Sequence, residues 1–467
     1  MSAQYSVAKL ANDPLLRTSI SLVASGTGKA QADAEAGQSP QKVASAQEAL
    51  DMAVSTALLL ASVVGVLQGL VYSLGADGIV RGMGVGAESP MYSHAVGYLE
   101  MRAIGAPAET LWLVCNGIFR GLGDTVTPLK MALVLTSLNA ILDPLFIFQQ
   151  ITLPGTSITL PGLGMGAAGA AAGTAIAQYV ALVGIFLELR KRATIKLDLR
   201  RLVPSLLAYL EAGVLVLVRT LGKVSAYTVC SREAALLGPV AAAANNLMFN
   251  LGVATTQVCE SVAVATQTLL AREMAKMGSK DDERGGKDTP ARRASKAAIW
   301  HVIKRGCALG FLVAAPLSLL TWFGRRGIVN GLTNSPPVQE ACLAIMPIVL
   351  VTQVAKGLAY PVNGVIMGGL DWRFSTVAMW TANAACLGAL WLQQASPGAN
   401  ALGTGGLGAG GLTSLWSIWV ALAVFMWTQV VGSVLRVASG TSMWGTIRTK
   451  KNKMINKKSE LHGGSSL

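Results

Sequence analysis

Long uninterrupted apolar segments dominate the sequence, separated by short polar stretches. They lie at roughly 50–73, 93–119, 127–149, 165–188, 203–223, 234–258, 298–322, 338–362, 374–395 and 411–436, with a shorter apolar stretch before residue 25. A helix needs about 20 apolar residues to cross a bilayer, and the backbone polar groups inside lipid must be paired within the segment. The pattern therefore predicts an all-α integral membrane protein with ten full spans and part of another. Unbroken apolar runs without alternation exclude a transmembrane β-barrel.

The composition agrees with a membrane protein and argues against an enzyme. Only 13% of the residues are charged and 52% are hydrophobic, whereas soluble domains carry about 25% charged residues. The six cysteines are isolated, the three histidines are scattered, and there is no phosphate-binding GxxxxGK[ST] motif. We therefore expect no metal or other cofactor and no enzymatic activity.

Basic residues are concentrated in a few segments, which indicates membrane topology rather than nucleic-acid binding. Residues 190–201 contain six Lys or Arg, residues 272–296 contain eight and residues 436–458 contain seven, whereas the loops at 150–164 and 396–410 contain none. The three basic segments are separated by even numbers of predicted spans, so they share one side of the membrane. The positive-inside rule makes that side cytoplasmic. The net charge of +14 is therefore not expected to reflect a nucleic-acid partner.

A short turn occurs twice, which indicates that the chain contains an internal repeat. Gly117, Gly121 and Asp124 recur as Gly364, Gly368 and Asp371, each shifted by 247 positions, and other short matches recur at nearly the same offset. The repeat predicts two homologous helical bundles related as parallel repeats. The predicted organisation is an incomplete N-terminal lobe (1–189, about four spans and a fragment), a cytoplasmic linker (190–202), a six-span C-terminal lobe (203–437) with a basic flexible loop (277–297), and a basic cytoplasmic tail (438–467).

Polar residues inside predicted spans are costly in lipid and are candidates for function. Asn139 and Asp143 lie four residues apart on one helical face, and a carboxylate beside a carboxamide suits a carrier of a proton or another cation. The alternative is that Asp143, followed by Pro144, caps a kink. Thr174 and Gln178, on the next span, can add hydrogen bonds to such a site or serve only as hydrogen-bonded contacts between helices.

The second half carries a polar stripe on one apolar helix. Asn246, Asn250, Gln257 and Glu260 are spaced by 4, 7 and 3 residues, which places them on one face and predicts the lining of a cavity. Asn245 adjoins the stripe. Glu211 and Arg219 lie eight residues apart on the preceding span, and Lys356 lies inside the span at 338–362, where it can snorkel or pair with Glu340 or Glu260. We treat Glu211, Asn245 and the stripe as candidate substrate contacts.

The two repeated aspartates have two interpretations. An Asp after glycine at a helix boundary is first a helix cap, and this is the interpretation we favour for Asp124 and Asp371. The alternative is a gate formed by ion pairs with their neighbours Arg120 and Arg373.

Several of these segments resemble one transporter family. GIFRGLGDTVTPL, followed by NAILDPLFIF and GMGAAGAAAGTAIAQ, is similar to the multidrug and toxic compound extrusion (MATE) family, and to its DinF-like branch of bacteria and plant plastids. In the second half, LEAGVLVLVR, GPVAAAANNL and ESVAVATQTLLA are similar to the same branch. The resemblance implies twelve helices in two lobes around a central cavity, and export of xenobiotics or organic acids by alternating access and antiport of H⁺ or Na⁺.

The resemblance also implies roles for individual residues. Asn139 and Asp143 match a cation-coupling pair, and Thr174 matches a coupling threonine on the next span. Glu260 stands where relatives often have Asp, and Asn245 and Asn246 stand where they often have His and Gln. The family's first span, with a further coupling Asp, has no counterpart, and its second span survives only in part. We interpret this as a start assigned too far downstream, with a degenerate protein as the alternative.

Other functions remain open at this point. A lipid-linked-sugar flippase of the same superfamily would need a cationic cavity, for which Lys356 and Arg219 are the candidates, and a non-transporting remnant is a third possibility. The expected location is a membrane, as a multi-pass protein of the plastid envelope or the plasma membrane. The expected partners are the lipid bilayer and small organic substrates, and the expected state is a monomer.

Overall fold

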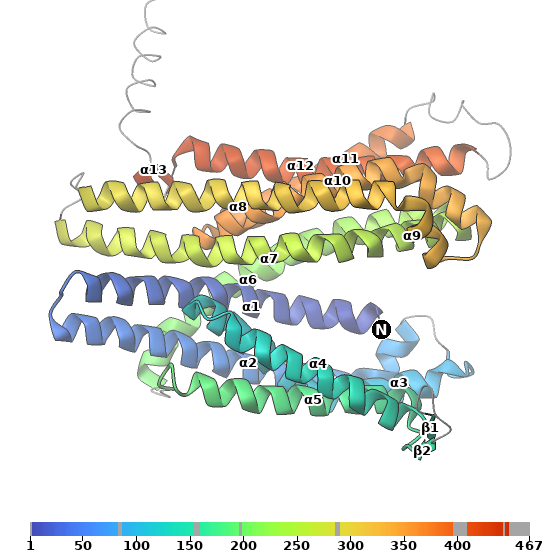
Figure 1. Cartoon of the computed structure of the whole chain (residues 1–467), viewed down its shortest axis with the longest axis horizontal. Helices are drawn as coiled ribbons and strands as arrows, with labels where there is room; N and C mark the ends of the chain where they lie inside the picture. The colour runs from blue at the N-terminus through green and yellow to red at the C-terminus, as the bar shows by residue number, and fades with distance from the viewer. Residues whose placement is uncertain are drawn as a thin grey trace, which may run out of the picture. The chain divides into compact units, whose positions relative to one another are not determined.

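The fold is almost entirely helical, as the apolar pattern predicted (Figure 1). The computed structural model describes residues 2–82, 86–152, 159–195, 199–284, 290–395, 409–441 and 444–447. Its helices are α1 (Ser2–Glu35), α2 (Pro40–Gly82), α3 (Met91–Leu122), α4 (Val126–Ile147), α5 (Gly166–Leu189), α6 (Leu199–Leu236), α7 (Pro239–Arg284), α8 (Pro290–Phe323), α9 (Arg325–Leu332), α10 (Pro336–Gly368), α11 (Trp372–Ala395), α12 (Ala409–Ser439) and α13 (Trp444–Ile447).

The described helices are those of an integral, multi-pass membrane protein. Eight of them are long and apolar enough to cross a membrane, namely α2, α4, α5, α6, α7, α8, α10 and α12. The two other predicted spans, 93–119 and 374–395, form the helices α3 and α11 but are not among these eight. In α3 the apolar sequence is interrupted by Glu100, Arg102 and Glu109. The fragment predicted before residue 25 belongs to the 34-residue helix α1.

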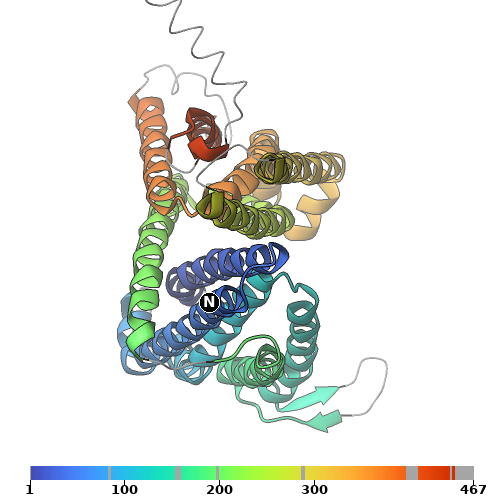
Figure 2. The same cartoon turned by 90° about the vertical axis from the view of Figure 1, so that its left-hand side faces the viewer.

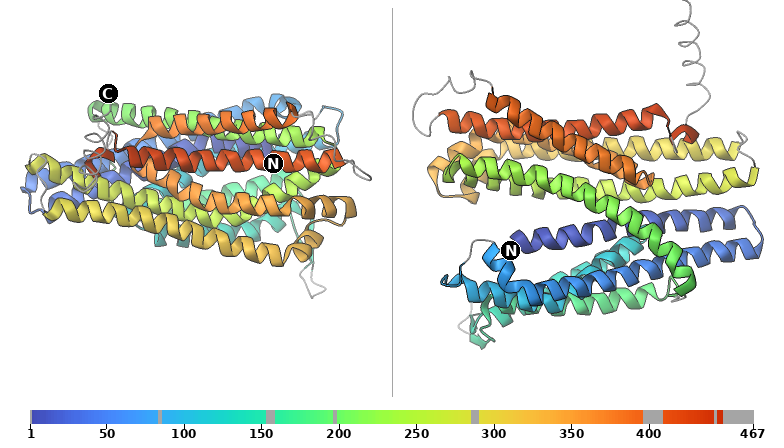
Figure 3. Two further views of the ribbon diagram at one scale, coloured as in Figure 1. Left: turned by 90° about the horizontal axis from the view of Figure 1, so that it is seen from above. Right: turned by 180° about the vertical axis from the view of Figure 1, so that it is seen from behind.

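Contacts between helices divide the chain into two compact units, Met1–Leu217 and Val218–Leu467. The division falls inside α6 (Figure 3), beyond the linker predicted at 190–202. The first part of α6 buries Tyr209 in an apolar cluster with Val54 and Phe119. The second part buries Cys230 in a different cluster with Met379 and Trp419. The side chains of one long helix therefore contribute to two separate cores.

The same arrangement of helices is built twice, once in each unit. In the first unit α3 packs against α1, α2 and α5, and α4 packs mainly on α5. In the second unit α10 packs against α7, α8 and α12, and α11 packs mainly on α12. Figure 2 views most of these helices close to end on, whereas the long helix α6, in green, is seen from the side. The residue ranges of these pairs differ by about the repeat offset of 247, so the predicted internal repeat is also a repeat of tertiary packing.

The repeated glycines lie where two helix backbones of each unit approach closely. A Cβ atom on Gly117 of α3 would lie 3.0 Å from the carbonyl oxygen of Leu16 in α1. A Cβ on Gly364 of α10 would collide with the carbonyl oxygen of Ala263 in α7. Leu16 and Ala263 are also 247 positions apart. The glycines recur because small residues allow backbones to approach closely in lipid.

The connections differ from the prediction in one place. The flexible loop predicted at 277–297 is shorter, because α7 continues to Arg284 and α8 begins at Pro290, and residues 285–289 lie outside the described residues. Ala, Lys, Glu and Arg in these segments are good helix formers, so the helices extend beyond their apolar parts. The strands β1 (Gln150–Thr152) and β2 (Thr159–Pro161) form an antiparallel pair between α4 and α5. The tail from residue 448 also lies outside the described residues.

We expect Gly364→Ala to destabilise the protein, because the new methyl group would meet the backbone of α7 rather than a movable side chain. Overpacking of this kind costs about 1–3 kcal/mol. The control is Gly388→Ala in α11, where a Cβ would meet nothing within 4 Å. Because alanine favours helix more than glycine does, this variant should be slightly more stable than the parent protein. The measurement is the thermal unfolding temperature of each purified variant in detergent. Equal unfolding temperatures for the two variants would contradict the close approach.

Candidate functional site

The predicted pair on α4 forms a direct contact. The side-chain amide of Asn139 donates a hydrogen bond of 2.8 Å to Oδ2 of Asp143, and both residues are half-buried. The carboxamide oxygen of Asn139 and the second carboxylate oxygen of Asp143, Oδ1 in both residues, are buried and have no hydrogen-bond partner among the described residues. Pro144 follows Asp143 inside α4, and the bond to Asn139 shows that the carboxylate also has a partner on its own helix face.

Helix α5 places a glycine, Gly173, against the carboxylate of Asp143. A Cβ on Gly173 would lie 2.8 Å from Oδ1 of Asp143, so the absence of a side chain there allows the carboxylate to face α5. The next residue, Thr174, is half-buried, and its hydroxyl donates a hydrogen bond to the carbonyl oxygen of Ala170. The structure thus brings Asn139 and Asp143 together and places them against the segment of α5 that carries Thr174.

The first unit also contains a buried ion pair that the sequence analysis missed. Arg102 and Glu109, both on α3, form an ion pair, and Arg102 is 5% exposed. Arg102 also donates a hydrogen bond of 3.4 Å to Oε1 of Gln178, one of the predicted site residues. The signal was present in the sequence, because opposite charges seven residues apart lie on one helical face.

A second set of buried polar contacts joins three helices of the same unit. The hydroxyl of Thr110 on α3 donates to Oδ1 of Asn12 on α1 at 3.0 Å and lies 3.4 Å from Oε1 of Gln68 on α2. The amide of Gln68 in turn donates to the hydroxyl of Tyr72. Such bonds need the three helices to pack together, so no spacing along the chain could have predicted them.

The predicted polar residues of the second half are placed differently from one another. On α7, Asn246, Asn250 and Gln257 are exposed and Glu260 is half-buried, whereas Asn245 is buried. The amide of Asn250 donates to Oδ1 of Asn246 at 3.3 Å, so these two members of the stripe share a face. Glu211 is exposed and belongs to the first unit, whereas Arg219 is buried and belongs to the second. No three His, Cys, Asp or Glu side chains of the described residues come together as a metal site would require.

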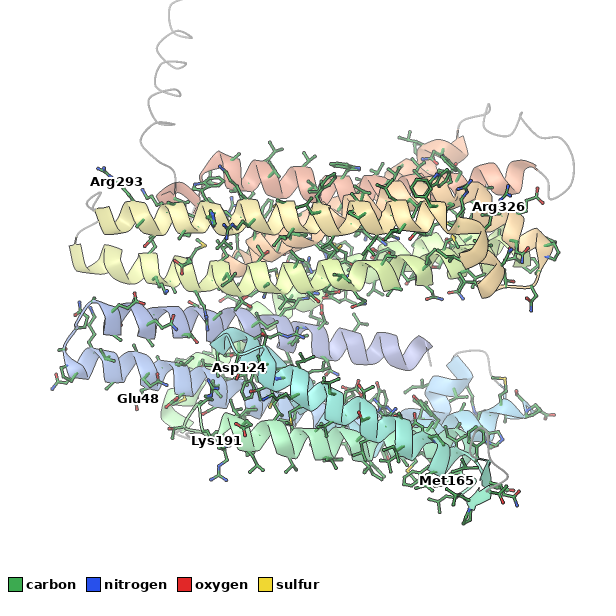
Figure 4. The ribbon with its side chains drawn as sticks, viewed as in Figure 1. Glu48, Asp124, Met165, Lys191, Arg293 and Arg326 are labelled. Atoms are coloured by element: carbon green, nitrogen blue, oxygen red, sulfur yellow. The ribbon has the colours of Figure 1, made fainter. Side chains whose placement is uncertain are left out.

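The first repeated aspartate caps a helix, as predicted. Oδ1 of Asp124 accepts hydrogen bonds of 3.0 Å from the amides of Val126 and Thr127, and Oδ2 accepts one from the hydroxyl of Thr127. Arg192, which follows α5, adds an ion pair at 3.2 Å. Figure 4 labels Asp124 and Lys191 at one end of the α4–α5 pair and Met165 at the other. Burial alone would raise the pKa of Asp124, but the hydrogen bonds from Thr127 and Val126 and the charge of Arg192 hold it below its usual value.

The second repeated aspartate binds an arginine in the equivalent part of its own unit. Oδ2 of Asp371 lies 2.9 Å from Nε of Arg436, near the end of α12, and accepts a hydrogen bond of 3.1 Å from the indole of Trp444 in α13. The arginine partners of Asp124 and Asp371 thus each lie more than 60 residues away along the chain. Ion pairs with the neighbouring Arg120 and Arg373, and a gating role for these four residues, stay predictions.

The backbone of the two turns is also the same. The amide of Asp124 donates to the carbonyl of Phe119, and the amide of Asp371 donates to the carbonyl of Ile366, which in each case closes the end of the preceding helix. The residue before each aspartate is left-handed, with φ of 82° at Gly123 and 58° at Leu370. Leucine adopts this conformation at a cost of roughly 1–2 kcal/mol, so the second turn keeps its shape despite an unfavourable residue.

Comparison with known proteins gives a consistent set of matches. The family model MatE matches residues 42–145. The chain is 27% identical to Protein DETOXIFICATION 43 of Arabidopsis thaliana over 402 residues, which cover 85% of this chain and 66% of that protein. It is 28% identical to Protein DETOXIFICATION 44, chloroplastic, of the same plant, over 94% of this chain and 74% of the relative. The chain thus spans between about two thirds and three quarters of the length of these relatives.

Solved structures share the fold. The Vibrio cholerae MATE transporter VcmN, in its bent form, superposes with a TM-score of 0.74 at 16% identity, covering 94% of this chain and 87% of that one. The outward-facing conformation of a multidrug resistance MATE family transporter of the MOP superfamily superposes with a TM-score of 0.70 at 16% identity, covering 96% and 89%. The predicted resemblance to the MATE family is therefore confirmed, and the finer placement in the DinF-like branch stays a prediction.

We expect Asp124→Asn to lower stability at neutral pH by roughly 0.3–1 kcal/mol, because the variant loses the negative charge that faces the start of α4 and Arg192. Because the folded-state pKa of Asp124 is lowered, its contribution is present above the unfolded-state pKa and is lost as the pH falls through the folded-state pKa. The difference in unfolding temperature between the parent protein and the variant should thus be full at pH 5 to 7 and shrink below about pH 4.

The control for this experiment is Asp77→Asn. Asp77 forms an ion pair with Arg81 on the surface of α2, where its side chain is 56% exposed, and exposed pairs of this kind contribute little. A loss of stability in Asp124→Asn that does not depend on pH would contradict the role of the ionised carboxylate.

Proposed function

We propose that this chain, identified by its family-model match and its relatives as a protein of the MATE family, exports organic compounds in exchange for H⁺ or Na⁺ by alternating access. Its relatives carry the name DETOXIFICATION, and one structural neighbour is described as a multidrug resistance transporter. These names support efflux of multidrug or toxic compounds by a membrane transporter that is not an enzyme. The argument for antiport comes from the polar pair Asn139 and Asp143 in the first unit.

The observation that carries the proposal is the pair of buried oxygens on Asn139 and Asp143 that have no hydrogen-bond partner within the described ranges of the chain. An acceptor buried without a donor is unfavourable, and two such acceptors on one helix face provide a place for a bound H⁺ or Na⁺. The carboxylate supplies the negative charge, and the carboxamide oxygen is a neutral ligand of the kind that accompanies it at sites for hard cations. Thr174, beside Gly173, is a further candidate ligand.

Binding of the ion would change the contact between α4 and α5. When Asp143 is ionised and holds no cation, its Oδ1 faces Gly173 and accepts no hydrogen bond from any residue that the structure describes. Protonation or a bound cation removes the cost of that buried charge, so the two states of the carboxylate favour different packing of α4 on α5. Such a two-state element is what couples an ion gradient to a change of conformation.

We propose that the substrate binds to other residues than the coupling ion does. The exposed amides of Asn246, Asn250 and Gln257, with Glu260 at the end of the same stripe, provide polar contacts on an apolar helix. A site of mixed apolar surface and few polar groups suits small organic molecules. These residues, with Glu211, Asn245 and Gln178, are proposed as substrate contacts.

We expect Asp143→Asn to abolish coupling. Proteoliposomes containing the purified chain should export ethidium when a pH gradient or a Na⁺ gradient is imposed, and the variant should not exceed protein-free liposomes. Asparagine keeps the size of the side chain and one acceptor oxygen, but it replaces the other oxygen with an NH2 donor and removes the charge. The loss would therefore report the need for an ionisable carboxylate. The gradient that drives transport identifies the coupling ion.

The matched control is Asp77→Asn, which removes an exposed carboxylate of the same unit and should transport like the parent protein. Gly173→Ala is a second variant, because its methyl group would displace Oδ1 of Asp143 and should weaken coupling while the carboxylate remains. Gradient-driven efflux that is unchanged in Asp143→Asn would refute the assignment of the coupling site.

A further inference from the structure

The second unit contains a groove between α11 and α12 that the proposed transport function does not use. Its volume is about 570 Å³, which is within the range of about 300–1,000 Å³ typical of small-molecule sites. Helix α11 packs mainly on α12, and it crosses α12 obliquely in the right-hand view of Figure 3 (α11 in dark orange, α12 in red). The groove is lined from α11 by residues between Phe374 and Thr381, and from α12 by residues between Val420 and Gly432.

The lining of this groove is apolar, and the two hydroxyl groups within it are already used. The hydroxyl of Thr381 donates a hydrogen bond of 2.9 Å to the carbonyl oxygen of Val377, and that of Thr428 donates one of 2.8 Å to the carbonyl oxygen of Val424. The other lining side chains are hydrocarbon, apart from the indole of Trp427. Because a polar group buried without a partner is unfavourable, the groove favours a ligand whose buried part has no polar atoms.

The groove opens on a face that lipid would cover. Helix α12 is one of the helices long and apolar enough to cross a membrane, and the lining residues Val377, Trp427 and Val431 are 62%, 46% and 52% exposed. Along α12 the lining extends from Val420 to Gly432, which is roughly 18 Å at the helical rise per residue. The hydrocarbon core of a bilayer is about 30 Å thick, so the groove has nearly the depth of one leaflet.

The dimensions of the groove fit one hydrocarbon chain better than another helix. Over this length, the volume of about 570 Å³ gives a mean cross-section of roughly 30 Å². A helix with its side chains is about 10–12 Å across, which corresponds to a cross-section about three times as large. A helix of a second copy would therefore leave the groove unfilled, whereas an extended acyl chain can follow its length.

One end of the groove lies beside basic residues. Phe374, in the first turn of α11, lines the groove, and the guanidinium carbon of Arg436 lies 5.1 Å from the centre of its ring. The ion pair with Asp371 holds Arg436 there, and Arg373, next to Phe374, is exposed. Guanidinium groups present planar sets of donors that match phosphate. A lipid whose chain enters the groove at this end would have its phosphate beside these arginines.

A glycine keeps the same end of the groove open. Gly432 lies one turn before Arg436 on α12, and a Cβ at this position would meet nothing within 4 Å among the described residues. Its φ is not positive, so the backbone does not require glycine, and glycine weakens the interior of a helix. The missing side chain thus serves neither a close helix contact nor a turn, and its effect is to leave space in the groove.

We propose that the groove between α11 and α12 binds one acyl chain of a membrane phospholipid, with the lipid phosphate beside Arg373 and Arg436. The bound lipid is a ligand of a defined site, as distinct from the surrounding bilayer. Because α11 packs mainly on α12, a chain in the groove would add to the contact that holds α11 in the unit. The inference does not depend on the proposed antiport.

The test is photo-crosslinking of the purified full-length chain in liposomes that contain a phosphatidylglycerol with a diazirine on one acyl chain. Mass spectrometry should place the label within residues 374–381 and 420–432. This label should saturate as the mole fraction of the probe rises, because the site holds one chain. Label on exposed apolar residues of α4, such as Leu133 (60% exposed) and Ile141 (66% exposed), should instead increase in proportion to the probe.

Two variants fill the groove from opposite sides. Gly432→Leu should lower the label in the groove about fivefold or more, and Val377→Trp, on α11, should do the same. The matched control is Gly388→Leu, also on α11, where a Cβ meets nothing within 4 Å of the described residues and which does not line the groove. It should be labelled like the parent protein. Arg373→Gln should raise the half-saturating mole fraction about threefold without moving the label.

Several results would contradict this site. Label that rises in proportion to the probe in the groove as well as on α4 would overturn the inference, and so would unchanged label in both Gly432→Leu and Val377→Trp. Stronger labelling by a diazirine-bearing sterol would also overturn it. A dimer in native mass spectrometry, with the groove labelled only after dissociation, would assign the groove to a second copy. An unchanged half-saturation in Arg373→Gln would refute the position of the phosphate.

Discussion

Close approach of helix backbones in lipid is the constraint on which the rest of this structure depends. Apolar side chains gain little from packing on one another in a bilayer, because lipid is as apolar as they are. Association then relies on contact at short range. Glycines on α3 and on α10 allow these helices to lie against α1 and α7 with almost no intervening side chain. These central crossings hold the helices around which the other members of each unit pack.

The same packing in both units leaves the polar residues free to differ. The aspartates of the two repeated turns each bind a distant arginine of their own unit, Arg192 or Arg436, and so secure a helix end twice. Asn139 and Asp143 have no such duplicate. At the equivalent positions stand Cys386 and Leu390, both buried in an apolar cluster. The helix packing is therefore repeated in both units, whereas the polar pair on α4 occurs in the first unit and has apolar residues at the equivalent positions of the second.

Buried charge is also distributed unequally between the units. In the first unit the buried Arg102 forms an ion pair with Glu109 and donates a hydrogen bond to Gln178. The charge of Arg102 is therefore balanced by an acidic side chain. In the second unit Lys356 has Gln353 and Gly252 beside it and no acidic partner among the described residues. Burying the paired arginine therefore costs less than burying a lysine that has no acidic partner.

The sequence by itself determined the helices, the repeat and the pair at Asn139 and Asp143, because these depend on apolar length, a constant offset and spacing along one helix. It also indicated the cap at Asp124. Only the tertiary structure decided that Asp124 and Asp371 bind Arg192 and Arg436, and that Thr110 joins Asn12 and Gln68. It also decided that Lys356 is buried with no acidic partner in the described part of the chain. Those contacts join residues far apart in the chain, and no local pattern encodes which distant side chain a folded helix will meet.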